Sequence, residues 1–283
     1  MRDAPPFQSL YELVSFLLDQ HFAGEQSHLA GRNTGILTDE EQDRLQDLIL
    51  TGEPLPVADA ITALLKRGIA PLAISDAVNI AYATFVVTGE PLPSFRAEYA
   101  RSFDYANVVN FCLRNTKTSQ QVTAIYLSAW FVTETVGKAS VSTPAPANET
   151  ANPSSPSTAA EDIATADLLS ELEVAISSHR PMHAVALVRE WNRRYDPAEP
   201  GARDDLIYVL ANCAAKHQGE PHVVHNAAAV IEEYQLNSAS QKRKDVLLEF
   251  WAHVLACHKR RPASPVGYGK RRRYFGMGIA GQA

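Results

Sequence analysis

The stretch PVADAITALLKRGIAPLAISDAVNIAYATFVVTGEPLPSFRAEYARSFDYANVVNFCLRN, residues 56–115, decides the fold class of this chain. Its apolar residues recur at the three-to-four spacing of amphipathic helices. Pro56 and Pro71 stand at positions where a first-turn proline is tolerated, and Gly68 falls where a helix is expected to end. The stretch therefore predicts three consecutive helices, the last of which ends near Asn115.

The same signals continue on both sides of this stretch. Thr38-Asp39-Glu40-Glu41 is a capping box that opens a helix, and the segment 119–136 is apolar on most sides, which is typical of a central helix. In the second half, helices are expected over 167–178, 181–195, 203–217, 221–234 and 240–258. No segment alternates as a strand does, so we predict an all-α protein made of two antiparallel αα-hairpin units.

A segment rich in Pro, Ser and Ala separates the two predicted units. Its small polar residues and four prolines cannot bury enough apolar area to offset the entropy lost on ordering. We therefore divide the chain into an N-terminal helical unit (1–137), a flexible linker (138–160), a C-terminal helical unit (161–260) and a basic tail (261–283).

Charge is distributed unevenly along the chain. The net charge is −6, yet the last 26 residues carry seven Lys and Arg and no acid, so the rest carries about −13 (−6 minus +7). An acidic body repels nucleic acid, so we do not expect nucleic-acid binding by the body. The tail cluster, in contrast, could bind anions, and it consists of Lys270, Arg271, Arg272 and Arg273.

The hydrophobic pattern and the cysteines indicate the kind of protein. The sequence has no apolar run of the roughly 18 residues that span a membrane, and its start has no secretory signal pattern. Three widely spaced cysteines, Cys112, Cys213 and Cys257, each lie inside a predicted helix. Buried, reduced thiols in a cytoplasmic protein are the expectation.

Histidines form the only candidate catalytic group. His222 begins one predicted helix and His258 ends another, so packing of these helices could bring the two imidazoles together as acid–base groups. Neither His-Glu-x-x-His nor Cys-x-x-Cys is present, so we expect neither a metal nor a cofactor. Surface or helix-end histidines without a catalytic role are the alternative.

A polar strip marks the helix that ends the opening stretch. Tyr105, Asn107 and Asn110 lie there with Arg114 among apolar residues, although Asn is a poor helix former. Hydrogen bonds between helices would explain the strip, and so would a ligand-facing patch. In the second case Tyr105, Asn107 and Asn110 are ligand-binding candidates, and Tyr105 and Asn107 share one pocket with His222 and His258.

Phe103-Asp104-Tyr105-Ala106-Asn107, together with the earlier Leu-Leu-Lys-Arg-Gly-Ile-Ala-Pro of residues 64–71, resembles the helical region of bacterial Rieske-domain-containing proteins of uncharacterised function. This region is distantly similar to questin-oxidase-like helical proteins. The resemblance extends to 221–234 and 256–258, and it implies roles for Tyr105, Asn107, His222 and His258. It departs in two places: the Cys-His pairs of a Rieske cluster are absent, and 100–102 replace a histidine common in the family.

Three functions follow as hypotheses, and the third of them is nucleic-acid binding by the arginine tail. The first is a helical binding or accessory protein that works with a redox or biosynthetic enzyme and that could form a homodimer. The alternative is a metal-free oxidoreductase, or another small-molecule enzyme, with a pocket between helices.

Overall fold

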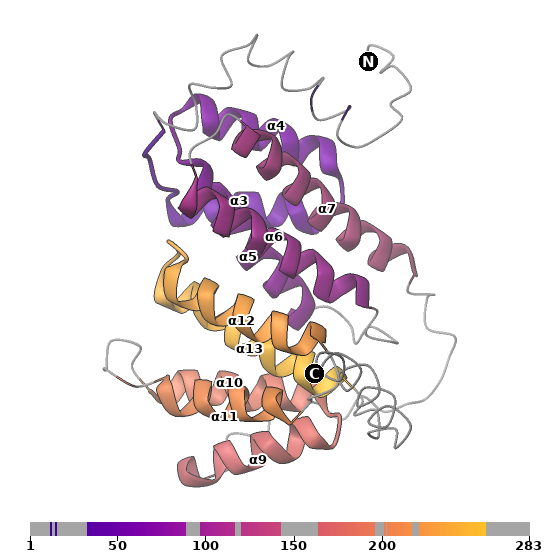
Figure 1. Ribbon diagram of the computed structural model, residues 1–283, viewed down its shortest axis with the longest axis vertical. Helices are drawn as coiled ribbons and strands as arrows, with labels where there is room; N and C mark the ends of the chain where they lie inside the picture. Colours follow the sequence, from indigo (N-terminus) through magenta and orange to yellow (C-terminus); the bar gives the residue numbers. More distant parts are fainter. Residues whose placement is uncertain are drawn as a thin grey trace, which may run out of the picture.

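The computed structural model describes residues 12, 15, 33–88, 97–116, 120–142, 164–195, 201, 203–216 and 221–258. Within these ranges the chain forms ten helices and no strand, which confirms the all-α prediction (Figure 1). The N-terminal helices are α3 (Asp39–Leu50), α4 (Pro54–Lys66), α5 (Pro71–Thr88), α6 (Ala97–Asn115) and α7 (Gln120–Ser142). The C-terminal helices are α9 (Thr165–Ser177), α10 (Pro181–Arg194), α11 (Asp204–Ala215), α12 (Pro221–Leu236) and α13 (Gln241–Cys257).

Local sequence signals set the helix ends. The Thr38 hydroxyl accepts a hydrogen bond from the Glu41 N–H, and the Glu41 carboxylate accepts one from the Thr38 N–H, so the predicted capping box is confirmed. Pro71 and Pro181 begin α5 and α10. Gly68 follows α4 with φ +87°, a conformation that a side chain disfavours.

Two glycines allow α3 and α7 to approach each other closely. Gly52, just after α3, has φ +75°, and a Cβ built on it would lie 2.6 Å from the Cα of Gly137 in α7. A Cβ on Gly137 would lie 2.8 Å from the Gly52 carbonyl oxygen. Any side chain at either position would therefore push the two backbones apart.

Helix α7 is longer than predicted. The sequence interpretation ended it at Val136, whereas it continues through Ser142, into the range assigned to the linker. No proline occurs in 137–142, so the local sequence does not end the helix at Val136. The rest of the predicted linker lies outside the described residues.

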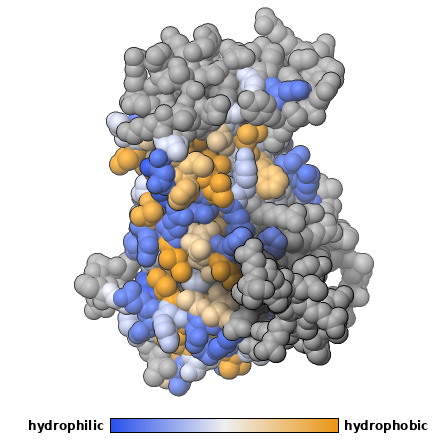
Figure 2. Space-filling model, viewed as in Figure 1, coloured by the Kyte–Doolittle hydropathy of each residue, from blue (hydrophilic) through white to orange (hydrophobic). Residues whose placement is uncertain are grey.

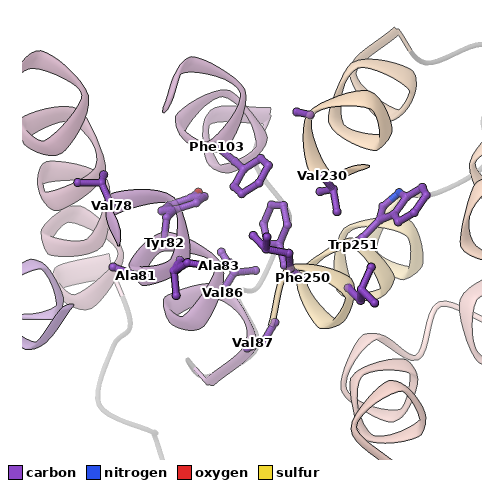
Figure 3. Packing of buried hydrophobic residues seen from close by; sticks show 14 of the residues in the cluster. Val78, Ala81, Tyr82, Ala83, Val86, Val87, Phe103, Val230, Phe250 and Trp251 are labelled. Atoms are coloured by element: carbon purple, nitrogen blue, oxygen red, sulfur yellow. The ribbon is translucent and has the colours of Figure 1, made fainter. Parts of the chain in front are cut away.

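Helices from both sides of this gap share one hydrophobic core. In Figure 1, α12 and α13 lie between the N-terminal helices and α9–α11. Phe250 of α13 is fully buried, and its ring centroid lies 4.5 Å from that of Phe103 in α6 and 6.2 Å from that of Tyr82 in α5 (Figure 3). The described helices of both halves are therefore packed against each other through aromatic side chains.

The central helix α5 is, alone among the described helices, long and apolar enough to cross a membrane. However, 78% of its residues are buried inside the protein. Burial against α3, α6, α7 and α13 accounts for its composition, as expected for the core helix of a helical protein.

Candidate functional site

A group of buried polar side chains lies where α5, α6 and α12 meet. We call it the carboxylate–amide cluster, and it consists of Asp76, Asn107, Asn110, Arg114 and Glu233. Asp76, Asn110 and Glu233 are at most 1% exposed. Because buried charges are costly without partners, each carboxylate here needs donors close by.

Helix α6 supplies these donors at positions 107, 110 and 114, which lie on one face of the helix. The Asn110 amide donates to both carboxylates, at 3.0 Å to Asp76 and 2.8 Å to Glu233. The Arg114 guanidinium also bridges them, at 3.2 Å from Asp76 Oδ1 and 3.0 Å from Glu233 Oε1. Asn107 donates to Glu233 at 3.0 Å. The two amides predicted as candidates therefore lie together, in hydrogen bonds between helices.

The protonation of Asp76 reflects this environment. Burial, followed by the negative charge of Glu233, raises the pKa of Asp76 to about 7, while the Ser238 N–H at 2.8 Å and Arg114 act in the opposite direction. Near neutral pH the Asp76 carboxyl is therefore partly protonated in the folded protein. His253 of α13, which is 3% exposed, behaves in the opposite way, since burial lowers its pKa to about 4.

These two groups predict opposing pH dependences of stability. Between pH 4 and 7 the folded protein keeps the Asp76 proton that the unfolded chain has lost, so this group lowers the free energy of unfolding as pH rises. Between pH 4 and 6.5 the unfolded chain binds a proton on His253 that the folded protein does not bind. This group therefore raises the free energy of unfolding as pH rises. At about 1.4 kcal/mol per pKa unit the contributions are roughly 4 kcal/mol for Asp76 and roughly 3 kcal/mol for His253, so between pH 4 and 6.5 the two slopes oppose each other and largely cancel.

Asp76→Asn should uncover the His253 contribution, so that the free energy of unfolding rises more steeply with pH than in the parent between pH 4 and 6.5. His253→Gln should uncover the Asp76 contribution, so that the free energy of unfolding falls as pH rises from 4 to 7. Urea unfolding at four pH values measures both slopes. Parallel profiles for the parent and Asp76→Asn would show that Asp76 titrates normally.

A second polar group lies further along the interface between α6 and α12. The Asn226 amide donates to Asp104 at 3.3 Å. Burial raises the pKa of Asp104, whereas the Asn226 hydrogen bond and the charges of His222 and His225 lower it. The pairs 104 with 226 and 107 with 233 advance in the same direction along both helices. His222 is therefore an electrostatic neighbour of a half-buried carboxylate on α6.

The other predicted histidine, His258, lies just after α13, which follows α12 through a short connection. Its convergence with His222 on one ligand stays a prediction. A different pair is in contact inside α13: Cys257 Sγ lies 3.7 Å from His253 Nδ1. Burial raises the pKa of the thiol to about 12 and lowers that of the imidazole to about 4, so this pair lacks the thiolate of a nucleophilic cysteine.

Tyr105 belongs to a different face of α6 from the two amides. It is 39% exposed, and Val108 and Phe111 on the same side are 55% and 53% exposed. The Tyr105 ring meets Phe131 of α7 edge-on at 5.8 Å. We call Tyr105, Val108 and Phe111 the α6 strip. Figure 2 shows apolar side chains interrupting the hydrophilic surface on the side of the molecule that α6 and α12 face.

Three further predictions concern the basic tail, a metal site and the cysteines. The anion-binding cluster Lys270–Arg273 lies outside the described residues. Within the described ranges, no three His, Cys, Asp or Glu side chains are arranged to hold a metal ion. Of the three cysteines, which form no disulfide, Cys213 is buried and Cys257 partly so, but Cys112 is exposed, because it lies on the outer face of α6 beside the strip.

The sequence interpretation missed both buried carboxylates of the cluster. Asp76 lies in the middle of a helix that is apolar on every side, and such a charge signals a paired partner. Glu233 shares a face of α12 with Asn226, seven residues earlier. Those two signals are readable in the sequence, but that these residues meet α6 is not.

Comparisons with known proteins add no relative. The resemblance to the helical region of Rieske-domain-containing proteins therefore stays an expectation. No family model, no curated protein and no solved structure matches this chain.

Proposed function

We propose that this protein is a helical binding protein whose α6 strip binds an amphipathic helix of a partner protein. The observation that carries the proposal is the exposure of Tyr105, Val108 and Phe111 along one side of one helix. Single exposed apolar side chains are common, but three at i, i+3 and i+6 lie within an arc of about 120° on one helix, and such a contiguous apolar patch marks an interaction site.

The surroundings of the strip support a partner rather than an internal ligand. Asn107 and Asn110, on the inner side of α6, donate their hydrogen bonds to carboxylates of the protein itself. The outer side presents an aromatic ring, Tyr105, that is already oriented by Phe131. A rigid aromatic side chain is a frequent anchor of protein interfaces.

The charge of the chain suggests the chemistry of the partner. The body carries about −13 (−6 minus +7), so a helix with basic residues beside its apolar face would associate fastest. We further propose that the protein that carries this helix is a redox or biosynthetic enzyme.

A photo-reactive amino acid at position 108 tests the proposal in cells that make the protein. We expect one partner to be crosslinked at position 108 and not at position 208, where Tyr208 of α11 is 71% exposed. Phe111→Asp should then weaken the binding of the purified partner at least tenfold, because it places a charge in an apolar contact.

Tyr208→Asp is the matched control, since it adds the same charge at another exposed aromatic position and should leave affinity unchanged. Equal crosslinking at positions 108 and 208 would contradict a binding face on α6. So would a partner whose affinity is unaffected by Phe111→Asp.

One observation favours the alternative of a metal-free enzyme. Asp104 lies within electrostatic reach of His222 and His225, and a carboxylate beside an imidazole is a common acid–base arrangement. Native mass spectrometry of the purified protein would reveal a retained small molecule under this alternative. His222→Gln should then release the molecule while the melting temperature changes little; retention by the variant would contradict a role for His222.

A further inference from the structure

A pocket with a volume of about 280 Å³ lies between the C-terminal parts of α9 and α11. Its apolar lining comes from Val174 and Ile176 of α9 and from Cys213 of α11. Ile176 and Cys213 are buried, whereas Val174 is 47% exposed, so this lining extends from the core to the surface. Small-molecule pockets have volumes of roughly 300–1,000 Å³, so the ligand that fits here is a small one.

His179, which also lines the pocket, has an unusual backbone conformation. Its φ is +57°, in the left-handed region that favours glycine, and it is the only non-glycine residue with positive φ among the described residues. The His179 N–H donates to the Ile176 carbonyl oxygen, and the Arg180 N–H to that of Ala175, which is the Schellman motif that ends α9. Glycine would form this motif without strain, so the strain at His179 points to a role for its imidazole.

Three polar groups of the pocket are hydrogen-bond acceptors. His179 Nδ1 donates to the Ala256 carbonyl oxygen at 3.1 Å, because a carbonyl can only accept, and the neutral imidazole therefore keeps Nε2 as an acceptor. The Ser177 hydroxyl donates its hydrogen to the Val174 carbonyl oxygen at 3.0 Å, so its oxygen is left to accept. The Glu173 carboxylate accepts as well, and it lies one turn before Ser177 on the same face of α9.

Lys216 is the one Lys or Arg in the lining of this pocket. Its ammonium lies 3.1 Å from the Glu173 carboxylate, and the two side chains are 42% and 39% exposed. Such an exposed pair contributes little to stability, so a ligand cation can replace the Lys216 ammonium while the flexible lysine turns into water. The C-terminal ends of α9 and α11 also favour a cation here, because of their partial negative charge.

We propose that this pocket binds a small primary amine with an apolar body. The ammonium of the ligand donates its N–H groups to Glu173, Ser177 and His179, and the apolar body covers Val174 and Cys213. A primary amine fits because three acceptors require three N–H donors. The site is separate from the α6 strip, since α12 and α13 lie between α9–α11 and the N-terminal helices (Figure 1).

Phenethylamine is a suitable probe for the full-length protein. Titration followed by backbone amide chemical shifts should give saturable changes at residues 173–179 and 213–216, with a dissociation constant on the order of 1 mM or below. Phenethyl alcohol and hydrocinnamate carry the same phenethyl group with no charge and with a negative charge. Both should bind at least about tenfold more weakly than the amine, because neither brings a cation to Glu173.

Two variants assign the roles of the acceptors. Glu173→Gln should weaken phenethylamine binding at least about tenfold. Glu171→Gln is the matched control, because it removes a carboxylate of similar exposure, 34%, from the same helix but not from the pocket lining, and it should leave the affinity unchanged. His179→Gly should weaken binding about fivefold and still fold, since glycine is favoured at this left-handed position.

No saturable shift at these residues below about 10 mM phenethylamine would overturn the proposal. Equal binding of phenethyl alcohol would overturn it too, and so would tighter binding of hydrocinnamate, because Lys216 would then hold an acid. Equal affinities of Glu173→Gln and Glu171→Gln would exclude the ion pair with the ligand. Unchanged affinity in His179→Gly would limit the imidazole to its hydrogen bond with Ala256 and contradict its role as an acceptor for the amine.

Discussion

Replacing Arg114 by Ala should lower the free energy of unfolding by about 3–5 kcal/mol, because it removes the only cation bonded to the carboxylate–amide cluster among the described residues. Glu233 is fully buried and Asp76 is 1% exposed, so neither carboxylate can recover the lost interaction from water. Asn107 and Asn110 would still donate hydrogen bonds, but they carry no charge. Urea unfolding followed by far-ultraviolet circular dichroism measures the loss.

The size of this loss should depend on pH. Because the pKa of Asp76 is raised to about 7, this carboxyl is protonated in the folded protein at pH 5 and needs its cation less. We therefore expect Arg114→Ala to cost more at pH 8 than at pH 5. An equal cost at both values would show that the charge of Asp76 does not change across this range.

Arg180→Ala is the matched control. Arg180 also pairs with a carboxylate, Glu171 at 2.9 Å, but their side chains are 45% and 34% exposed. Exposed pairs are worth about 0–1 kcal/mol, so this variant should change stability little. A loss below 1 kcal/mol in both variants would contradict the structural role of the cluster.

Phe250→Ala should have a comparably large effect, a loss of about 3–5 kcal/mol, through packing instead of charge. The ring is fully buried and touches Phe103 and Tyr82, so its removal leaves a cavity between α13 and the N-terminal helices. Because this contact joins the two halves of the chain, both halves should lose stability together, in one cooperative transition.

Two probes separate the outcomes of this experiment. Tryptophan fluorescence reports Trp130 in α7 as well as Trp191 and Trp251 in the C-terminal helices, and circular dichroism reports all helices. Phe111→Ala, at an exposed position, should change stability by no more than about 0.5 kcal/mol. Two separate transitions, of which only one shifts in Phe250→Ala, would show that the halves fold independently.

The sequence by itself determined the helices and most of their ends. Capping by Thr38, the prolines at 71 and 181 and the left-handed Gly68 act through neighbouring backbone atoms, and such local interactions are readable without knowledge of the rest of the chain. The predicted end of α7 at Val136 was wrong for a reason that is also local. Residues 138–142 contain neither a proline nor a glycine that would stop the helix.

Only the tertiary structure decided what the polar residues of α6 do. Periodicity indicates that Asn107 and Asn110 share a face, but not which helix covers that face. Their partner Glu233 lies more than 120 residues away in the sequence. The packing of α12 on α6 buries the two amides and leaves Tyr105 exposed on the other side of α6. Contacts between distant helices depend on shape and charge complementarity over the whole core, and that information is not contained in any local pattern.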